Sequence, residues 1–503
     1  MPQPTPPSVL RSPRLWIGTG LIAAVVSILF ALLYVGGNVN PRGNLHDLPV
    51  AVVNGDTGAK VNGRQMNAGD QVVAGIEKAA RGKDSIDWQV LTRAEADERL
   101  GQGKLYGALV IPKDFTATVT GLLAPPQPPA GAKAGAGAGA GAGQQAGAPQ
   151  AGQLAPPTLT VLTNQAAGSI GSSMASQATQ KAAHAASAQL GKELLQQAGG
   201  SKAQLPPAAR LMLTDPVTVT VADGHPLGAR SAMGLSAFYY ALVLVVCGML
   251  GANLVNSQVD SALGYLHADF GPFRQRMPLR HTNRVRTLAI GSVLMLGLSV
   301  LMGTLVEVAT VGILDMDASH LGLLWLYSVA TVFVVGVGGL ALFAAFGTPG
   351  MLLATIVFIA AAVPSSGATV PVQALPGFFR TLAEFEPLRQ ITDGLRSILY
   401  FDAQAGAGLT RGWTAMAIAL VAALLFGFAV TRFYDRRGLH RIPRPAEAAG
   451  AGAIPAPTET TEAAEAGAAG SEGEAEAGSE GEAGSESAGE SEVAGDAAAP
   501  AKG

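Results

Sequence analysis

LGLLWLYSVATVFVVGVGGLALFAAF, residues 321–346, is an apolar run that contains no Asp, Glu, Lys or Arg. A helix of about 20 such residues crosses about 30 Å of hydrocarbon, so this run is long enough to span a membrane. Five further apolar runs occur in the chain. They are residues 16–35, 234–254, 288–306, 351–363 and 413–430. The pattern predicts a polytopic α-helical membrane protein with six transmembrane helices.

The six runs divide the chain into parts, because a long, mostly polar segment separates the first run from the second. We expect a cytoplasmic N-terminus (1–15), transmembrane helix 1 (16–35), an extracytoplasmic α/β domain (36–232), a five-helix membrane domain (233–431) and a cytoplasmic C-terminal part (432–503). The last part begins as a basic stub and continues as a tail of Glu, Gly, Ser and Ala. Such a tail has too little apolar surface to fold, so we expect it to be disordered.

The bulk composition agrees with a membrane protein. Of 503 residues, 49% are hydrophobic and 14% are charged, whereas about 25% of the residues of soluble proteins are charged. The formal net charge of −3 combines an acidic tail with an otherwise basic chain. Cys247 is the only cysteine in the sequence, which excludes an intrachain disulfide and a cysteine-based metal site.

The first run is expected to be a retained anchor, because its apolar core is longer than the about 7–15 residues of a signal peptide. Arg11 and Arg14 precede it, and cations near helix ends mark the cytoplasmic side. Arginines in the loop 255–286 and after the sixth run agree with this orientation. The charge pattern therefore predicts that both termini are cytoplasmic.

The loop 365–411 departs from this charge pattern, because it must lie outside and yet contains four arginines. The fifth run is also short, and Pro364 follows it. A re-entrant segment that does not cross the membrane is therefore an open alternative for the fifth run.

The outer domain shows strands alternating with helices, the pattern of an α/β fold. LPVAVV, residues 48–53, predicts a buried strand closed by the turn formers Asn54, Gly55 and Asp56. Further strands are expected at 88–91, 105–111, 158–162 and 217–221, and helices at 65–80, 93–100 and 169–197. A Pro/Gly/Ala-rich insert, residues 123–157, interrupts this domain and is expected to be a flexible linker.

Three segments carry a resemblance to a known family: LPVAVVNGDTGA (48–59), YGALVIPKDFTA (106–117) and PLRQITDGLRSILYFDA (387–403). They resemble the YhgE/Pip (phage infection protein) family of bacterial membrane proteins, whose plan of one helix, a large outer segment and five helices is also similar. That family is similar to the permease subunits of type-2 ABC exporters. The resemblance implies a permease-like six-helix domain in a bacterial cell membrane. Many relatives carry a long outer coiled coil, which a Gly/Ala linker and a modest helix replace here.

Motifs for catalysis are absent from the sequence. It has no G-x-x-x-x-G-K-[ST] for ATP phosphates, no HExxH, no CxxC and no G-x-S-x-G. We therefore expect no enzyme, no catalytic, cofactor-binding or metal-binding residues, and no nucleic-acid partner. The centres of the six runs carry no ionisable residue, and Glu307 lies at the outer end of the third, which argues against an ion-coupled carrier.

The predicted cytoplasmic loop between the second and third runs contains aromatic residues and arginines. Its sequence is LGYLHADFGPFRQRMPLRHTNRVR, residues 263–286. The permease resemblance implies a coupling element that docks on a separate ATP-binding subunit. The alternative is an interfacial helix whose arginines meet anionic lipid headgroups. The candidate contact residues are Phe270, Phe273, Arg274, Arg276 and Arg280.

A second candidate site follows the fifth run. Apolar residues recur there at three- and four-residue steps, which predicts an amphipathic helix with one apolar face, broken near Pro387. We expect it to lie on the outer leaflet or to close the mouth of the bundle, packed against the membrane helices. A substrate gate is the alternative. Its candidate residues are Phe378, Phe379, Phe385, Arg389 and Asp393.

These expectations favour a permease-like component of an export system that has no ATPase of its own and acts on an unknown substrate. An envelope receptor or scaffold, whose outer domain binds a partner, is the alternative from a different class. The expected partners are the lipid bilayer, a separate ATP-binding subunit and a second copy of the chain. Gly336, Gly338 and Gly339 permit close helix approach within the chain or in such a dimer.

Overall fold

The computed structural model describes residues 13–38, 40–61, 64–81, 84–122, 156–199, 214–266, 268–270, 273–275 and 277–439. All of them belong to one compact unit. The predicted acidic tail and nearly all of the predicted flexible insert lie outside the described residues.

Five strands form a mixed sheet in the order β4-β1-β5-β6-β7. They are β1 (Leu48–Asn54), β4 (Ile86–Leu91), β5 (Gly107–Ile111), β6 (Thr158–Thr163) and β7 (Thr218–Asp223), and a separate hairpin consists of β2 (Ala59–Val61) and β3 (Arg64–Met66). β1 pairs in parallel with β4 and β5, β5 pairs antiparallel with β6, and β6 pairs in parallel with β7. The expected α/β domain and its five expected strands are confirmed.

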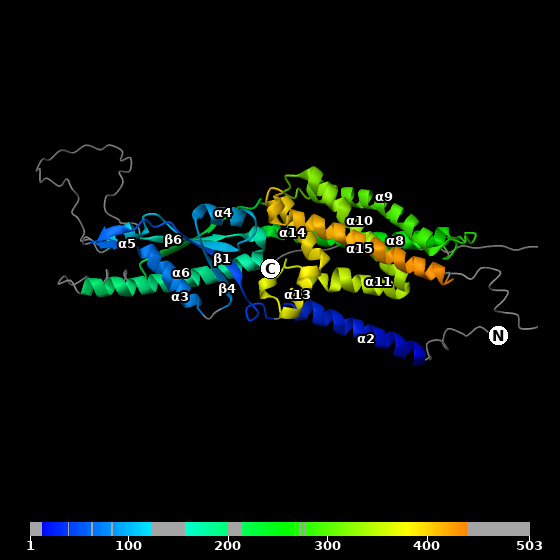
Figure 1. Ribbon diagram of the computed structural model, residues 1–503, viewed down its shortest axis with the longest axis horizontal. Helices are drawn as coiled ribbons and strands as arrows, with labels where there is room; N and C mark the ends of the chain where they lie inside the picture. The colour runs from blue at the N-terminus through cyan, green and yellow to red at the C-terminus, as the bar shows by residue number, and fades with distance from the viewer. Residues whose placement is uncertain are drawn as a thin grey trace, which may run out of the picture. The chain divides into compact units, whose positions relative to one another are not determined.

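Helices cover both faces of this sheet (Figure 1). They are α3 (Ala68–Ala80), α4 (Arg93–Gly101), α5 (Phe115–Gly121) and α6 (Ser169–Gly199). Val52 of β1 shares a core with α3, α5 and α6, whereas its neighbours Ala51 and Val53 share one with α4. Successive residues of a strand point to opposite faces, so the uninterrupted apolar run of β1 supplies both cores.

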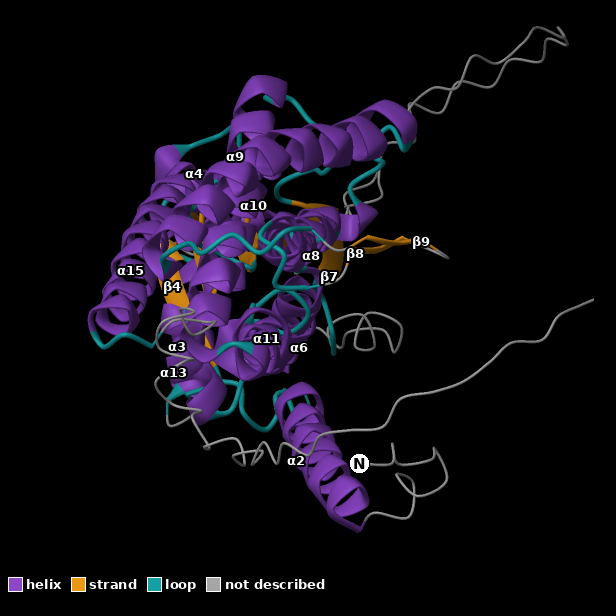
Figure 2. Cartoon of the chain, turned by 90° about the vertical axis from the view of Figure 1, so that its right-hand side faces the viewer, coloured by secondary structure: helices purple, strands orange, loops and turns teal. Residues whose placement is uncertain are grey.

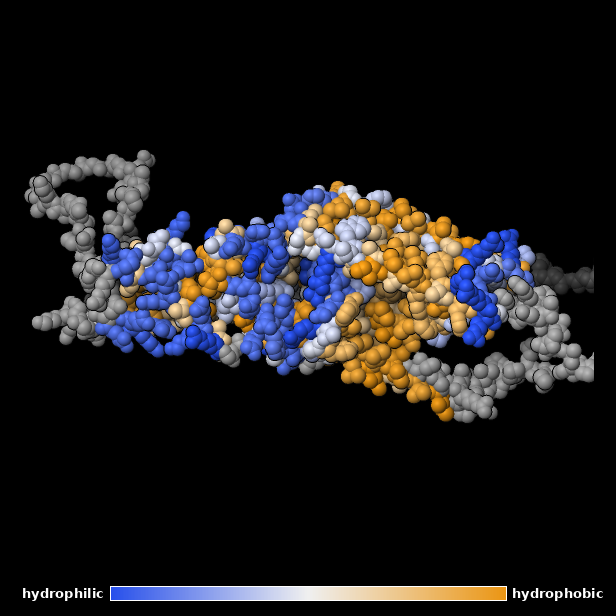
Figure 3. Space-filling model, in the orientation of Figure 1, coloured by the Kyte–Doolittle hydropathy of each residue, from blue (hydrophilic) through white to orange (hydrophobic). Residues whose placement is uncertain are grey.

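Among the described residues, five helical segments are long and apolar enough to cross a membrane. They are α8 (Ser236–Ala262), α9 (Arg284–Glu307) with η3 (Val308–Ile313), α10 (Leu321–Phe346), α11 (Thr348–Thr355) with η4 (Ile356–Ala360) and α12 (Ala362–Ser365), and α15 (Leu409–Arg436). Apolar surface gathers over the helices in Figure 3, whereas the α/β domain is mostly hydrophilic. The first predicted run forms α2 (Pro13–Gly36), and its membrane crossing stays a prediction.

The fifth predicted run is a helical segment of 18 residues, 348–365, with a π-helical turn in its middle. At about 1.5 Å per residue it spans about 27 Å, close to the about 30 Å of a hydrocarbon core. Its length therefore favours a full crossing over the re-entrant alternative. The short helices η1 (Gln165–Ala167), η2 (Ala232–Gly234), η5 (Val372–Ala374) and η6 (Ala405–Ala407) lie in loops.

Helix α10 packs against α8, α9, α11 and α15 and is central among the apolar helices. Its glycines allow this close packing. A Cβ placed on Gly339 would lie 2.9 Å from the Cβ of Ala252, and one on Gly336 would overlap the side chain of Met295. Packing within one chain therefore accounts for both glycines.

The predicted amphipathic stretch forms two helices. They are α13 (Gly377–Phe385) and α14 (Pro387–Tyr400). Leu388 and Leu395 on α14 are 1% and 0% exposed, because α14 packs against α8, α10 and α15. Phe378 and Phe385 on α13 are 67% and 80% exposed. The predicted break near Pro387 and the predicted packing against the membrane helices are therefore confirmed for α14. The apolar face does not continue into α13, because Phe378 and Phe385 are exposed.

The predicted coupling loop contains a β-hairpin, so the interfacial helix of the alternative prediction is wrong. Its strands are β8 (Ala268–Phe270) and β9 (Phe273–Gln275). The hairpin extends from beside the end of α8 (Figure 2). The side chains of Phe270, Phe273 and Arg274, and the whole of Arg276, lie outside the described residues. Arg280 is exposed in the loop that leads to α9.

Candidate functional site

A buried carboxylate fixes the N-terminus of α14. Oε1 of Glu386 accepts a hydrogen bond from the Leu388 backbone N at 2.9 Å, and Oε2 accepts one from the Arg389 N at 2.9 Å. Glu386 is 3% exposed, and burial raises its pKa to about 7 although both hydrogen bonds act in the opposite direction. The cap satisfies two N–H groups that the helix leaves free, and so sets the direction in which α14 presents its side chains.

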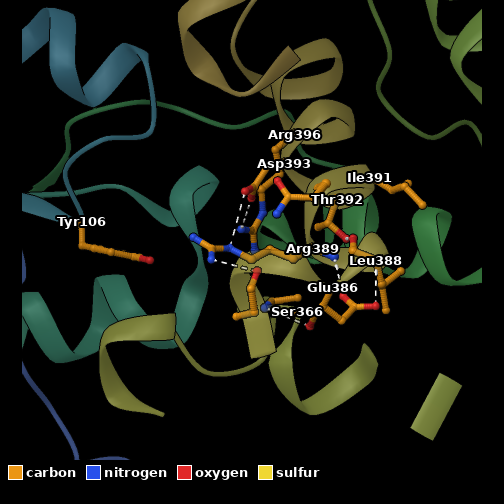
Figure 4. A network of polar contacts seen from close by, with 12 residues as sticks. Tyr106, Ser366, Glu386, Leu388, Arg389, Ile391, Thr392, Asp393 and Arg396 are labelled. Carbon is orange, nitrogen blue, oxygen red and sulfur yellow. Dashed lines mark hydrogen bonds and ion pairs between the residues drawn. The ribbon is translucent and has the colours of Figure 1, made fainter. Parts of the chain in front are cut away.

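Three charged residues follow along α14. The Nε of Arg389 lies 3.8 Å from Oδ2 of Asp393, and Nη1 of Arg396 lies 3.8 Å from Oδ1 of the same carboxylate. Arg389 also donates from Nη1 to the carbonyl oxygen of Ala383 at 3.1 Å. Figure 4 shows this network around the start of α14. One carboxylate therefore faces two guanidinium groups, and the cluster keeps a positive charge.

Arg396 is the buried member of this cluster. It is 6% exposed, and its Nε and Nη2 have no hydrogen-bond partner among the described residues. These two nitrogens form one edge of the guanidinium group, and such an edge binds a carboxylate or a phosphate through two parallel hydrogen bonds. Burial of a charge without complete pairing costs free energy. An anion at this edge would satisfy both donors.

Arg396 lines a polar cavity of about 660 Å³ between the α/β domain and the helices. Its described lining includes four cationic side chains and one carboxylate. These are Lys104, Arg389, Arg396, Arg411 and Asp393. The excess of positive charge in a confined space favours an anionic ligand.

Contacts between the α/β domain and the segment around α14 lie beside this cavity. The hydroxyl of Tyr106 donates to Oε1 of Gln373 at 3.4 Å, and Nε2 of Gln404 donates to the backbone carbonyl of Gly101, the last residue of α4, at 3.4 Å. Gly103 has a φ of +66°, and a Cβ there would lie 2.8 Å from the ring of Phe401. Only glycine adopts this conformation easily and leaves room for the ring.

An apolar cavity of about 440 Å³ adjoins the polar cavity along α15. Arg411 and Thr414, one turn apart on α15, line both cavities. The rest of the wall comes from α10, η4, α13, α14 and α15, and Glu384 of α13 is part of it. It includes Val334, Val335, Val357, Phe358, Ile418 and Ala419. A cationic region therefore lies next to an apolar one.

The predicted outer site is only partly assembled. Arg389 and Asp393 lie in the polar cavity, and Phe385 lies in the wall of the apolar cavity. Phe378 is exposed on α13 and lies in the wall of neither cavity, whereas Phe379 is buried in a cluster with Leu33 of α2. The adjacent phenylalanines therefore have different environments.

Lys104, Arg396 and Arg411 are not among the predicted site residues. Arg396 follows Asp393 by three residues and Arg389 by seven, so helical spacing alone places the three on one face and could have identified Arg396. Lys104 belongs to the α/β domain, and no local pattern connects it with α14. Tertiary structure alone brings it to the cavity.

The described residues contain no group of three or more His, Cys, Asp and Glu side chains placed to hold a metal ion. The two cavities instead present hydrogen-bond donors, cations and apolar walls. Such groups bind and orient a ligand that has one charged end and one apolar end.

Both cavities lie mainly within a part of the chain that matches a known family. Residues 19–131 and 144–419 match the family described as protein of unknown function (DUF3533). The chain belongs to the DUF3533 family. The residues between the two matched parts are AKAGAGAGAGAG, 132–143, and this run lies outside the match. No curated protein matches the chain.

Proposed function

We propose that this DUF3533 protein is a permease-like component of a bacterial export system, embedded in the cell membrane and without an ATPase of its own. The resemblance of three segments to the YhgE/Pip family supports the proposal. The observation that carries it is the apolar cavity beside α10 and α15, whose volume of about 440 Å³ suits a ligand pocket. A hydrophobic or envelope-bound substrate fits such a wall.

The energy for export comes, in this proposal, from a separate ATP-binding subunit, because the sequence has no phosphate-binding loop. The hairpin loop 263–286 is the docking element, and its arginines and aromatic residues suit a contact with another protein. The chain itself has no catalytic activity, and it works as a homodimer or with this subunit.

Purification of the tagged chain from its native cells in a mild detergent, followed by mass spectrometry, tests this proposal. We expect an ATP-binding protein in stoichiometric amount, which the double variant Arg274→Glu/Arg276→Glu loses while membrane insertion is unchanged. A matched control, Arg436→Glu/Arg437→Glu at the end of α15, should keep the partner. Recovery of the chain without an ATP-binding protein, or equal retention by both variants, would contradict the proposal.

An envelope receptor or scaffold is the second candidate. The α/β domain favours it, because this domain has two apolar cores of its own and can present a stable surface. In the same purification, envelope proteins bound through the α/β domain, without an ATP-binding protein, would support this alternative. The two functions are thus separated by one measurement.

A further inference from the structure

We propose that the polar and apolar cavities together bind an anionic phospholipid, with its headgroup in the polar cavity and an acyl chain in the apolar one. Arg389, Arg396 and Arg411 recognise the headgroup. This inference goes beyond the proposed export function and does not rest on it, because a bound lipid can be cargo or a lasting part of the protein.

The headgroup position follows from the pairing of Arg396. Oδ1 of Asp393 lies 3.8 Å from Nη1 of Arg396. The other edge of the guanidinium, Nε and Nη2, has no hydrogen-bond partner among the described residues. A phosphodiester offers two oxygens at the spacing of that edge. Arg389 and Arg411 line the same cavity and add positive charge. Asp393 repels an anion, so the phosphate lies on the side of Arg396 that faces away from this carboxylate.

The acyl-chain position follows from the shared wall. Arg411 and Thr414 belong to both cavities, so a molecule bound at the arginines can continue into the apolar cavity without leaving the protein. Beyond them, Val334, Phe358 and Ile418 present carbon surface. The apolar wall stabilises a hydrocarbon chain by removing its surface from water.

The order of the two cavities matches the polarity of a bilayer. Arg411 stands in the first turn of α15, a candidate membrane span, and Lys104 belongs to the α/β domain outside the spans. The apolar cavity instead runs along α15 and the middle of α10. A phospholipid has its charged group at the membrane surface and its chain in the hydrocarbon, which is the same order.

A free phosphate shares the headgroup chemistry but not the chain. Of the two sources, the phospholipid explains the apolar cavity and its junction with the polar one at Arg411 and Thr414. Phe385 lies in the wall of the apolar cavity and is 80% exposed, so its ring can contact a lipid tail.

Displacement of a fluorescent phosphatidylglycerol from the full-length protein in neutral detergent tests the inference. We expect unlabelled phosphatidylglycerol to displace it, and phosphatidylcholine with the same chains or inorganic phosphate to displace it poorly. Arg396→Gln and Arg411→Gln should each weaken phosphatidylglycerol binding about tenfold, the effect of losing a charged hydrogen-bond donor. Arg93→Gln, on the exposed surface of α4, is the matched control and should bind like the wild type.

The apolar end has its own variant. Ala419→Phe places a ring in the apolar cavity and should weaken phosphatidylglycerol binding. Equal displacement by phosphatidylcholine, or unchanged binding in both Arg396→Gln and Arg411→Gln, would overturn the inference. Displacement by inorganic phosphate as strong as by phosphatidylglycerol would also overturn it, in favour of a free anion. Because the assay needs no partner and no transport, its failure is separate from a failure of the export proposal.

Discussion

The carboxylate of Asp56 joins the loop after β1 to the helices α3 and α5. Oδ1 accepts hydrogen bonds from the backbone N of Gly58 at 3.2 Å and of Thr116 at 3.1 Å, and Oδ2 accepts from the Gly69 N at 2.9 Å and from the Thr116 hydroxyl. Gly69 and Thr116 stand in the first turns of α3 and α5, so one negative charge faces two helix N-termini. Desolvation opposes the charge, yet these hydrogen bonds lower the pKa of Asp56.

Asp56→Ala should therefore lower the free energy of unfolding of the α/β domain by about 1–2 kcal/mol at pH 7, a modest value because the carboxylate is partly exposed. A lowered pKa means that this stabilisation is present above the unfolded value of 3.8 and disappears as the pH falls through the folded pKa. Chemical unfolding at pH 7 and pH 3 measures both effects. Asp87→Ala, on an edge strand, is the control; an equal loss in both variants would contradict the prediction.

Glu386 gives a pH dependence of the opposite sign. Its pKa is raised to about 7, from 4.5, by burial. Its stabilising contribution is therefore complete below about pH 4.5 and is lost as the pH rises through about 7, at a cost of about 3 kcal/mol. The melting temperature of the wild type should fall between pH 5 and pH 8, and that of Glu386→Gln should fall less. Glu384→Gln changes an exposed carboxyl two residues away and should keep the wild-type slope. Parallel slopes in all three proteins would exclude this assignment.

At the scale of the elements, α10, α14 and α15 meet at Tyr327. The Tyr327 side chain is fully buried, and its hydroxyl donates to the carbonyl oxygen of Ile391 on α14 at 3.3 Å. Its ring packs edge-on against Trp413 of α15, with 5.2 Å between the ring centroids. A Cβ added to Gly394 or Gly412 would overlap the Tyr327 hydroxyl. The three helices approach closely because both positions lack a side chain.

Gly412→Ala should consequently lower the stability of the bundle by about 1–3 kcal/mol, as overpacking does. Tyr327→Phe removes the hydroxyl and should recover part of this loss in the double variant. Thermal unfolding in detergent compares the variants with Gly297→Ala, because a Cβ at Gly297 meets no atom within 4 Å. If Gly412→Ala and Gly297→Ala melt at the same temperature, the close contact at Tyr327 is not a packing constraint.

The sequence predicts some of these elements well because their signal is local. β1 is an apolar run ended by Asn, Gly and Asp, and each apolar helix is a run of about 20 residues. The break near Pro387 is predicted correctly, but the spacing continues through Glu386 and Pro387 and gives no sign that the apolar residues on the two sides of the break have different environments. Periodicity assumes one helix axis, and a capped break between two helices redirects every later side chain.

At the scale of the whole molecule, contacts sort the helix ends into two groups. In the group beside the α/β domain, the start of α8 contacts the end of α14, because Ser236 Oγ lies 2.7 Å from the Tyr400 hydroxyl. The loop before α10 belongs to the same group, since Oδ2 of Asp317 accepts a hydrogen bond from the Arg230 backbone N at 2.7 Å. The other group joins α15 to the end of α10 and the start of α9. There the Tyr434 hydroxyl donates to a carbonyl of α10 at 2.9 Å, and Asp435 accepts from the backbone at the start of α9.

The candidate site is the least predictable feature at this scale. Arg389 and Asp393 could be found from the sequence, because they are charged residues of the amphipathic stretch, and helical spacing could have added Arg396. Lys104 and Arg411 reach the same cavity from the α/β domain and from α15, and the packing of distant segments alone decides that meeting. The apolar cavity has no local signal either, because its walls look like any membrane helix in sequence.

The grouping of the helix ends also predicts the topology of the fifth apolar segment. It begins directly after the end of α10, and the chain that follows it reaches Gln373, which contacts Tyr106 of the α/β domain. A re-entrant segment would return to the side where it began, so these contacts predict a crossing. In a Cys247→Ala background, a membrane-impermeant maleimide should label Asp87→Cys and Thr381→Cys in intact cells, and Arg437→Cys only after permeabilisation. Labelling of Thr381→Cys together with Arg437→Cys would instead place α13 in the cytoplasm and support the re-entrant arrangement.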